Sequence, residues 1–265
     1  MAKFLRPVLF AAAGAAVAAL VIAERRRPLR RRTQAVAQRT AANLALGASC
    51  AAVIAAVEEP LCQAIAQRNE AGRRGLAGIL PRPMRLAAGL AAMDYGFYLW
   101  HVATHKVPLL WRFHRVHHVD PDLDASTAVR FHTLDMLVSL PWRLVQVRLS
   151  GVDRKGLALW RQFFNASILF HHANLRLPGG WDRRIAWLLT TPEMHGIHHS
   201  AERVQRDSNW SSGFSLWDRL HGTLRQDRAQ AELTIGVDDA CAGKDIALLP
   251  ALKAPFRPES EIAQA

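Results

Sequence analysis

Apolar segments recur along the chain and predict a set of helices. They lie at residues 8–23, 42–57, 86–100, 134–149 and 158–170. Most are shorter than the roughly 20 residues that cross a bilayer unaided, so flanking Trp and Arg side chains must complete each span. The first two have the composition of lipid-facing helices. Polar residues in the last two favour a buried or hairpin-like pair, and these residues are Arg143, Arg148, Arg161 and Asn165. The pattern therefore predicts an all-α integral membrane helical bundle.

The chain becomes mixed in polarity beyond residue 175, after a break at the sequence LPGGW. The segment WDRRIAWLLTT at 181–191 is expected to lie flat on the membrane surface, with its apolar side chains toward lipid. These side chains are Trp181, Ile185, Trp187, Leu188 and Leu189. From about residue 225 onward no periodic pattern is long enough to predict an element, so we expect a tail with some packed portions.

Composition separates a membrane protein from a nucleic-acid-binding one. The chain is 50% hydrophobic yet carries a formal charge of +12. Six arginines fall within ERRRPLRRRT at 24–33, directly after the first apolar segment. This arrangement is typical of a juxtamembrane anchor, and no nucleic-acid-binding motif accompanies it. The arginine block also argues against cleavage of the first segment as a secretory signal. We therefore expect a retained anchor and no nucleic-acid partner.

The cysteines do not form a recognisable site. Cys50, Cys62 and Cys241 have no C-x-x-C spacing, and the first two lie in apolar surroundings where packing explains them. We expect neither a disulfide nor a cysteine-ligated metal.

The arginine block also predicts an orientation. If residues 25–32 are cytoplasmic, counting spans places the end of the third apolar segment and everything from 171 onward on the cytoplasmic side as well. The loop 68–85 carries five arginines and would then be external, a conflict that a re-entrant second segment would remove. The sequence thus predicts an integral protein of a bacterial inner membrane whose active site faces the cytoplasm.

The histidines point to metal. All twelve lie between positions 101 and 221. They form one H-x-x-x-H motif at His101 and His105, and two H-x-x-H-H motifs, the first at 114–118 and the second at 195–199. On a helix, positions i, i+3 and i+4 share a face. The two adjacent histidines of H-x-x-H-H diverge by about 100°, which lets them reach two different ions. Since a tetrahedral zinc needs about four ligands, so many histidines suit two metals better than one.

Neighbouring residues support this interpretation. Thr191 is suited to cap a helix that begins at Pro192, with Glu193 in its first turn, so the last motif is expected on a helix. Asp94 lies two turns before His101 and is a candidate to orient a ligand or a ring proton. An isolated histidine such as His132 or His221 is more often a core or surface residue than a ligand.

Imidazole donors suit zinc, copper, nickel and iron alike, so the donor type does not identify the metal. Two ions held by neutral imidazoles keep a high positive charge. Beside a bilayer, such a site favours binding and reducing dioxygen next to a hydrocarbon chain.

The motifs resemble those of a known superfamily. DYGFYLWHVATHKVPLLWRFHRVHHVDPDLDASTAVRFH, LFHHANLRLP, TPEMHGIHHS and NWSSGFSLWDRLHGT occur in this order. They are similar to the fatty acid hydroxylase and sterol desaturase superfamily of histidine-rich membrane di-iron oxygenases, over roughly residues 90–225. The resemblance implies an all-helical membrane enzyme with a cytoplasmic, histidine-lined di-metal centre. Val102, Thr133 and Ile168 depart from residues common in relatives, which leaves metal binding intact but weakens the likeness to any one subfamily.

Carried over position by position, the resemblance implies nine metal ligands. They are His101, His105, His114, His117, His118, His172, His195, His198 and His199. His132, in the position of an R-x-H motif, is a possible further ligand, and the sequence does not decide whether His171 is one. The implied cofactor is a pair of iron ions, with zinc as a possible substitute.

The leading hypothesis is a membrane-bound di-iron oxidoreductase that uses O2 and reducing equivalents to hydroxylate or desaturate a lipid. The lipid is a fatty acyl chain, a sterol-like ring or a carotenoid, and a separate protein must donate electrons because no flavin, haem or ferredoxin motif is present. The alternatives are a non-catalytic membrane metal-binding protein and a metal-dependent hydrolase with Glu193 as general base. We divide the chain into N-terminal membrane anchor helices and loop (1–85), a fatty acid hydroxylase-like catalytic domain (86–225) and a C-terminal tail (226–265).

Overall fold

The computed structural model describes residues 2–238 and 243–258. Within these ranges the regular elements are helices, joined by three isolated β-bridges. The long helices are α1 (Ala2–Arg26), α2 (Val36–Val53), α3 (Glu59–Gly72), α5 (Arg85–Lys106), α7 (Thr133–Ser150) and α8 (Arg154–His172). A π-helical turn, Ile54–Glu58, joins α2 to α3 without a break. Every predicted apolar segment lies within these helices, so the helical part of the prediction is confirmed.

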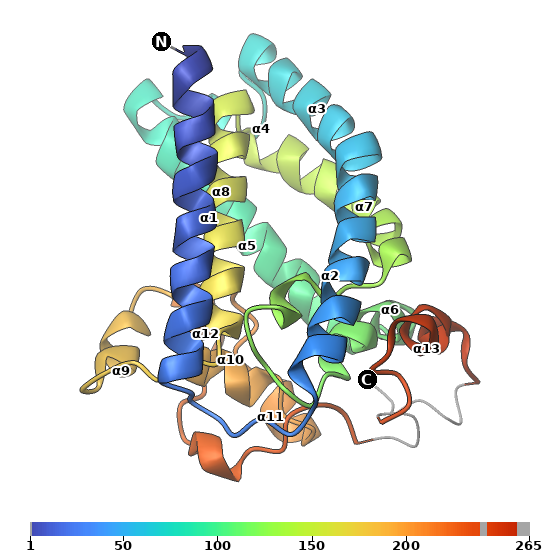
Figure 1. Cartoon of the computed structure of the whole chain (residues 1–265). Coiled ribbons are helices and arrows are strands. Elements are labelled where there is room, and N and C mark those ends of the chain that lie inside the picture. Colours follow the sequence, from blue (N-terminus) through green and yellow to red (C-terminus); the bar gives the residue numbers. More distant parts are fainter. Residues whose placement is uncertain (1, 239–242, 259–265) are drawn as a thin grey trace.

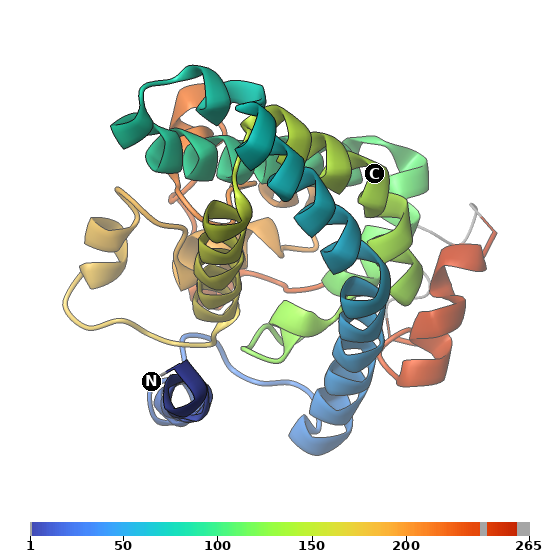
Figure 2. The same ribbon diagram turned by 90° about the horizontal axis from the view of Figure 1, so that it is seen from above.

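Shorter elements complete the chain. They are α4 (Gly75–Ile79), α6 (Pro108–His118), α9 (Trp181–Ile185), α10 (Pro192–His198), α11 (Arg203–Arg206), α12 (Leu216–His221) and α13 (Leu248–Lys253). Four 3₁₀ turns accompany them, at Arg82–Met84, Thr127–Val129, Gln230–Glu232 and Ala254–Phe256. Figure 1 shows α6 and α9 to α12 gathered at one end of the long helices, while α3 and α4 reach the other end. Figure 2 shows α1 standing apart from the other long helices.

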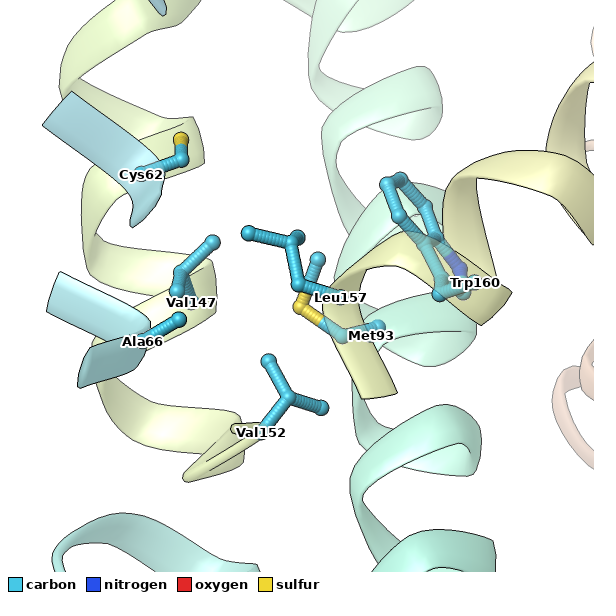
Figure 3. Packing of buried hydrophobic residues seen from close by; sticks show 7 residues of the cluster. All are labelled: Cys62, Ala66, Met93, Val147, Val152, Leu157 and Trp160. Atoms are coloured by element: carbon cyan, nitrogen blue, oxygen red, sulfur yellow. The ribbon is translucent and has the colours of Figure 1, made fainter. Parts of the chain in front are cut away.

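The helices pack around an apolar core at the α3–α4 end. Figure 3 shows its members: Cys62, Ala66, Met93, Val147, Val152, Leu157 and Trp160. They come from α3, α5, α7, α8 and the turn between α7 and α8, and each is at most 3% exposed. Burying a side chain such as Leu157 contributes roughly 1.5–3 kcal/mol. The core therefore fixes the spacing of the four helices that carry or surround the histidines.

Two glycines bring two turns into main-chain contact at the same end. Gly75 has φ +70° and Gly151 has φ +72°, in the left-handed region that favours glycine. A Cβ on Gly151 would lie 2.4 Å from the carbonyl oxygen of Arg74, and one on Gly75 would lie 2.5 Å from the Gly151 nitrogen. The α3–α4 and α7–α8 turns thus pack backbone against backbone, which only glycine permits.

A second apolar cluster covers the histidine end. Leu46 of α2 and Val116 of α6 pack against Ala251 and Ala254 near the end of the described chain. The described part of the predicted tail is therefore packed against the helices rather than separate from them.

The membrane bundle itself stays a prediction. Among the described residues one helical stretch, Val36–Ile79, is long and apolar enough to cross a membrane, with a mean hydropathy of 1.8. Only 22% of its most apolar window is buried by the rest of the protein. The segment expected to lie on the membrane surface forms only the short helix α9, but Trp181, Trp187 and Leu188 are exposed as expected. Ile185 and Leu189 are half-buried.

Candidate metal centre

Nine buried histidines form two adjacent groups. In each group the nearest ligand nitrogens all lie within 4.8 Å of one another. The larger group consists of His101, His105, His114, His118 and His198. The smaller group consists of His117, His172, His195 and His199. The structure thus brings together every histidine that the sequence nominated as a ligand, while metal binding by these residues stays a prediction.

Each H-x-x-H-H motif contributes to both groups. In the first motif His117 belongs to the smaller group and His118 to the larger one. In the second motif His198 belongs to the larger group and His199 to the smaller one. The divergence of adjacent side chains around a helical turn explains this division. His118 and His199 also stack, with ring centroids 4.2 Å apart, where the two groups meet.

Helix ends position these histidines. α5 ends at Lys106, and Pro108 starts α6 at its first position, so His101 and His105 face the motif of α6 across a tight turn. Thr191 caps α10 by accepting a hydrogen bond from the Met194 amide at 3.4 Å, which confirms the predicted start of that helix. His172 is the last residue of α8.

Main-chain carbonyls fix the orientation of four rings. Since a carbonyl only accepts, the Nδ1 atom of each ring must donate. The four donors are His101 to Trp210 (2.7 Å), His117 to Arg130 (3.1 Å), His172 to Ile168 (2.7 Å) and His198 to Ser208 (2.8 Å). A neutral imidazole that donates through Nδ1 presents the lone pair of Nε2. Such an arrangement is the usual support of a histidine metal ligand.

Two of these lone pairs face each other. The Nε2 atoms of His117 and His172 are 3.0 Å apart, although both rings already donate through Nδ1. Two neutral rings in this state cannot hydrogen bond to each other through Nε2. Two further Nε2 atoms lie next to them. Nε2 of His195 is 3.0 Å from that of His172, and Nε2 of His199 is 3.1 Å from that of His195. A cation bound by the four nitrogens would remove the repulsion, and two nitrogens about 2.1 Å from a metal lie about 3.0–3.4 Å apart for bond angles of about 90–109°.

Burial keeps the imidazoles neutral. It lowers the pKa of His101 to about 4 and that of His172 to about 3. Burial, together with neighbouring imidazoles, also holds the pKa of each of the other seven well below its ordinary value. At neutral pH the nine rings are therefore neutral, which is the form in which an imidazole can bind a metal ion.

Several ring nitrogens have no hydrogen-bond partner among the residues that the structure describes. Both nitrogens of His105 and of His118 are buried without a hydrogen bond, and so is Nε2 of His114 and of His198. Buried polar atoms normally have partners, so this concentration of unpaired donors and acceptors is unusual. Imidazole nitrogens converging without carboxylate or thiolate neighbours fit borderline metals such as iron and zinc.

A buried polar network supports the first H-x-x-H-H motif. Arg130, whose carbonyl accepts from His117, donates to the Val116 carbonyl and to Asn43 of α2, each at 2.8 Å. Arg39 of α2 pairs with Asp120 and Asp124, in the loop that follows the motif. The loop from 119 to 132 is thereby tied to α2, which holds the carbonyl partner of His117 in place.

A close contact explains the glycine within the second motif. A Cβ on Gly196 would lie 2.3 Å from Oε1 of Gln230 and 2.4 Å from a guanidinium nitrogen of Arg30. Arg30 is buried and donates to Gln230 at 2.5 Å and to the Pro192 carbonyl at 3.3 Å. Part of the arginine block that follows α1 thus packs inside the protein against α10, whereas the sequence indicated only a surface anchor.

Aromatic side chains pack around the two histidine groups. Phe131 stacks on His117 at a centroid distance of 4.3 Å and an angle of 8°. The buried Trp111 and Trp210 lie against His105, at 5.0 and 4.7 Å. Sequence patterns did not single out these residues, because their contacts come from segments up to about a hundred positions apart.

The remaining candidates lie elsewhere. His132 caps α7 by accepting from the Leu134 amide at 3.1 Å, and its Nε2 donates to the Leu252 carbonyl at 3.2 Å. Both its nitrogens are used, so the structure does not bring this residue to either group. His171 is buried against His195, with centroids 4.0 Å apart, but its nitrogens are not among those of the two groups. His221 contacts the Tyr95 hydroxyl at 3.0 Å.

Asp94 does not orient a histidine. Its carboxylate accepts from the Phe214 amide at 2.9 Å and from Trp217 Nε1 at 2.7 Å, so it ties α5 to α12 and to the segment just before it. The expectation that Asp94 holds a ligand ring is therefore wrong. Cys50 and Cys62 are buried and free, and Cys241 lies outside the described residues.

An apolar cavity of about 520 Å³ adjoins both groups. Its wall is built mainly by α2, the π-helical turn, α5, α7 and α8, and five histidines reach it: His101, His114, His117, His172 and His195. Figures 1 and 2 show α2 and α8 in front of α5 and α7. Ala51, Ala55 and Asn165 line the cavity and are exposed, so it opens between α2 and α8. Its size and composition suit a lipid chain.

The sequence model of the fatty acid hydroxylase family matches residues 86–223, just over half of the chain. Ornithine lipid hydroxylase OlsE of Rhizobium tropici is 28% identical over 158 residues, covering 59% of this chain and 46% of that protein. Cholesterol 25-hydroxylase-like protein of Danio rerio is 30% identical over 149 residues, covering 56% of this chain and 58% of that protein. Alkylglycerol monooxygenase of Homo sapiens is 26% identical over 142 residues, covering 54% of this chain and 31% of that protein. The chain thus spans about half or less of most of these relatives, and no solved structure matches it.

Proposed function

The chain belongs to the fatty acid hydroxylase family, and we propose that it is a membrane-bound di-iron oxidoreductase that hydroxylates a lipid with O2. The observation that carries the proposal is the meeting of two groups of neutral, buried imidazoles at the inner end of an apolar cavity. The names of the relatives favour hydroxylation over desaturation, since they are hydroxylases and monooxygenases.

Iron fits the site and the reaction class together. Imidazoles alone would hold zinc equally well, but zinc has no redox chemistry. Two iron ions held by the five-histidine and four-histidine groups would supply the binding and reduction of dioxygen next to a C–H bond. One oxygen atom enters that bond, and the other leaves as water after two electrons and two protons are supplied. A separate protein must donate the electrons.

The chain's own residues prepare this reaction in three ways. The carbonyls of Trp210, Arg130, Ile168 and Ser208 hold the rings in the tautomer that presents Nε2. Phe97 and Phe131 line the cavity beside the histidines and exclude water from it. The cavity wall holds an alkyl chain by apolar contact, at roughly 25 cal/mol per Å² of buried surface.

We further propose that the histidine end faces the cytoplasm of a bacterial inner membrane. Arg30 packs against α10, so the arginine block and the histidine groups lie at the same end of the long helices. Positive residues favour the cytoplasmic side. The opening of the cavity between α2 and α8 lies beside the exposed, apolar surface of Val36–Ile79, so lipid would enter sideways from the bilayer.

The proposal is tested by labelling. Membranes containing the protein are incubated under ¹⁸O2 with a reducing system, and the lipid extract is compared with that of a His195→Ala variant by mass spectrometry. We expect one ¹⁸O atom in a lipid of the wild-type extract and none in that of the variant. A His221→Gln variant, which changes a histidine outside both groups, should behave like wild type.

The alternatives make different predictions in the same experiment. Label entering from H2¹⁸O rather than from ¹⁸O2, with zinc sufficient for activity, would replace the oxygenase by a hydrolase. Bound metal that reductant and dioxygen do not change would favour the non-catalytic metal-binding protein.

A further inference from the structure

Asp135 is a buried carboxyl group in the wall of the apolar cavity. It lies in the first turn of α7 and is 4% exposed. Its carboxyl group makes no hydrogen bond or close ion pair with the described residues, although the positive charge of Arg143 acts on it. Asp94, Asp120 and Asp218 each accept two or more bonds from the protein. Asp135 therefore differs from these three buried acids, whose carboxylates all accept hydrogen bonds from the protein.

Burying an unpartnered carboxylate is costly, even where a helix N-terminus lowers the cost. A purely structural role would give it a partner, because removing a carboxylate from water without one destabilises the fold. Asp135 is also not among the residues whose donor atoms form the two histidine groups. The cavity that it lines is the route by which a bonding partner can reach it.

The charges facing the cavity indicate what that group is. Three carboxylates line the cavity, those of Glu58, Glu59 and Asp135, against two guanidinium groups, Arg143 and Arg161. Both arginines are directed to the glutamates: Arg161 contacts Glu58 at 3.2 Å and also Glu59, and Arg143 lies 3.9 Å from Glu58.

Arg143 is held further by its other contacts. Its side chain bonds to Gln146 at 3.0 Å and lies over Phe97 at 5.3 Å. Arg143 is close enough for its charge to act on Asp135, but its guanidinium bonds to Gln146 and not to this carboxyl group. The free oxygens of Asp135 are therefore complementary to a hydrogen-bond donor rather than to an anion.

Resting on the function proposed above, we propose that Asp135 binds a hydroxyl or ammonium group of the lipid and so selects substrates that carry a hydrogen-bond donor. The same cavity carries His117 and His172, so a lipid held at Asp135 presents a neighbouring part of its chain to the histidines. A hydrogen bond that involves an ionised donor or acceptor contributes roughly ten- to a hundredfold in affinity.

The test measures binding, not turnover. The full-length protein is reconstituted in lipid nanodiscs, and the binding of hexadecylamine, hexadecanol, palmitate and hexadecane is measured by native mass spectrometry. The wild type should bind the amine and the alcohol at least tenfold more tightly than palmitate or hexadecane. Comparing hexadecylamine with hexadecanol shows whether Asp135 prefers an ammonium group or a hydroxyl group.

Two variants test the residue itself. Asp135→Asn keeps the shape, so it should lose the preference for the amine over the alcohol while still binding the alcohol. Asp135→Leu should lose the preference for both donors by about tenfold or more and bind hexadecane at least as well as wild type. Glu70→Gln, a change of an exposed carboxylate on α3, is the matched control and should match wild type.

Iron content separates the two possible failures. If Asp135→Leu keeps the wild-type order of affinities, or if the wild type prefers palmitate, the inference about Asp135 is overturned while the di-iron proposal stands. If the wild type shows the donor preference but never binds iron, the oxygenase proposal fails and the donor site remains. Asp135→Asn is nearly isosteric, so it keeps the test decisive should Asp135→Leu not fold.

Discussion

The Nε2 atoms of His117 and His172 lie 3.0 Å apart, and both rings donate through Nδ1 to main-chain carbonyls. The two lone pairs that face each other come from α6 and from the end of α8. Neutral imidazoles cannot stabilise this approach by themselves, so the fold holds two nitrogen lone pairs in an arrangement that suits a cation. The predictions below follow from this arrangement.

Removing His172 should empty one group and spare the other. In His172→Ala the smaller group keeps three histidines and loses the ring that contacts both His117 and His195. We expect tightly bound iron to fall from two to about one per chain, measured by plasma mass spectrometry after dialysis. His221→Gln should keep two irons, and a variant His172→Ala that also keeps two would contradict the assignment.

Stability should fall as the pH falls below about 6.5. The imidazole of an unfolded chain titrates near pH 6.5, whereas burial lowers the pKa of folded His101 to about 4. Between these values the unfolded chain binds more protons than the folded one, so the free energy of unfolding decreases as the pH is lowered and recovers above pH 6.5. Thermal unfolding of the metal-free protein from pH 8 to pH 4 measures this. A melting temperature that rises toward pH 4 would show that the histidines are not buried and neutral.

Chelation should destabilise the fold. An ion that binds only the folded state stabilises it by about 4 kcal/mol when present at roughly a thousand times its Kd. Removing iron also leaves nine converging imidazoles without their partner. We therefore expect a lower melting temperature after chelation, restored by adding iron back under anaerobic conditions. Equal melting temperatures with and without metal would mean that metal contributes nothing to folding.

The glycine contact between the two turns should be sensitive to a single methyl group. Gly151→Ala places a Cβ 2.4 Å from the Arg74 carbonyl and strains a φ of +72°, so it should destabilise by about 1–3 kcal/mol. Iron per folded chain should not change, since the site lies at the other end of the helices. Gly14→Ala, where a Cβ meets nothing within 4 Å, is the control and should be neutral or slightly stabilising.

The sequence predicts the ligand set but not its surroundings. Helical spacing and the resemblance nominate nine histidines, and the structure brings all nine together. His132 illustrates the limit, because a motif position cannot show that both its nitrogens bond to the main chain. Asp94 shows the same limit: its partners, Phe214 and Trp217, lie about 120 positions away in the sequence.

The sequence carries a signal for Asp135. An acid within an apolar segment indicates a functional site, and Asp135 lies within the apolar segment 134–149 just as Asp94 lies within 86–100. What the pattern could not supply is the packing that leaves one of these two acids with partners and the other without. The cavity and the carbonyl partners of the histidine rings depend on the same long-range contacts.

The central claim is that the two histidine groups hold two irons side by side. An anomalous difference map collected at the iron absorption edge, from crystals of the iron-loaded protein, tests this most directly. We expect two peaks, one among His101, His105, His114, His118 and His198 and the other among His117, His172, His195 and His199. A single peak, or peaks away from these groups in the fully loaded protein, would contradict it.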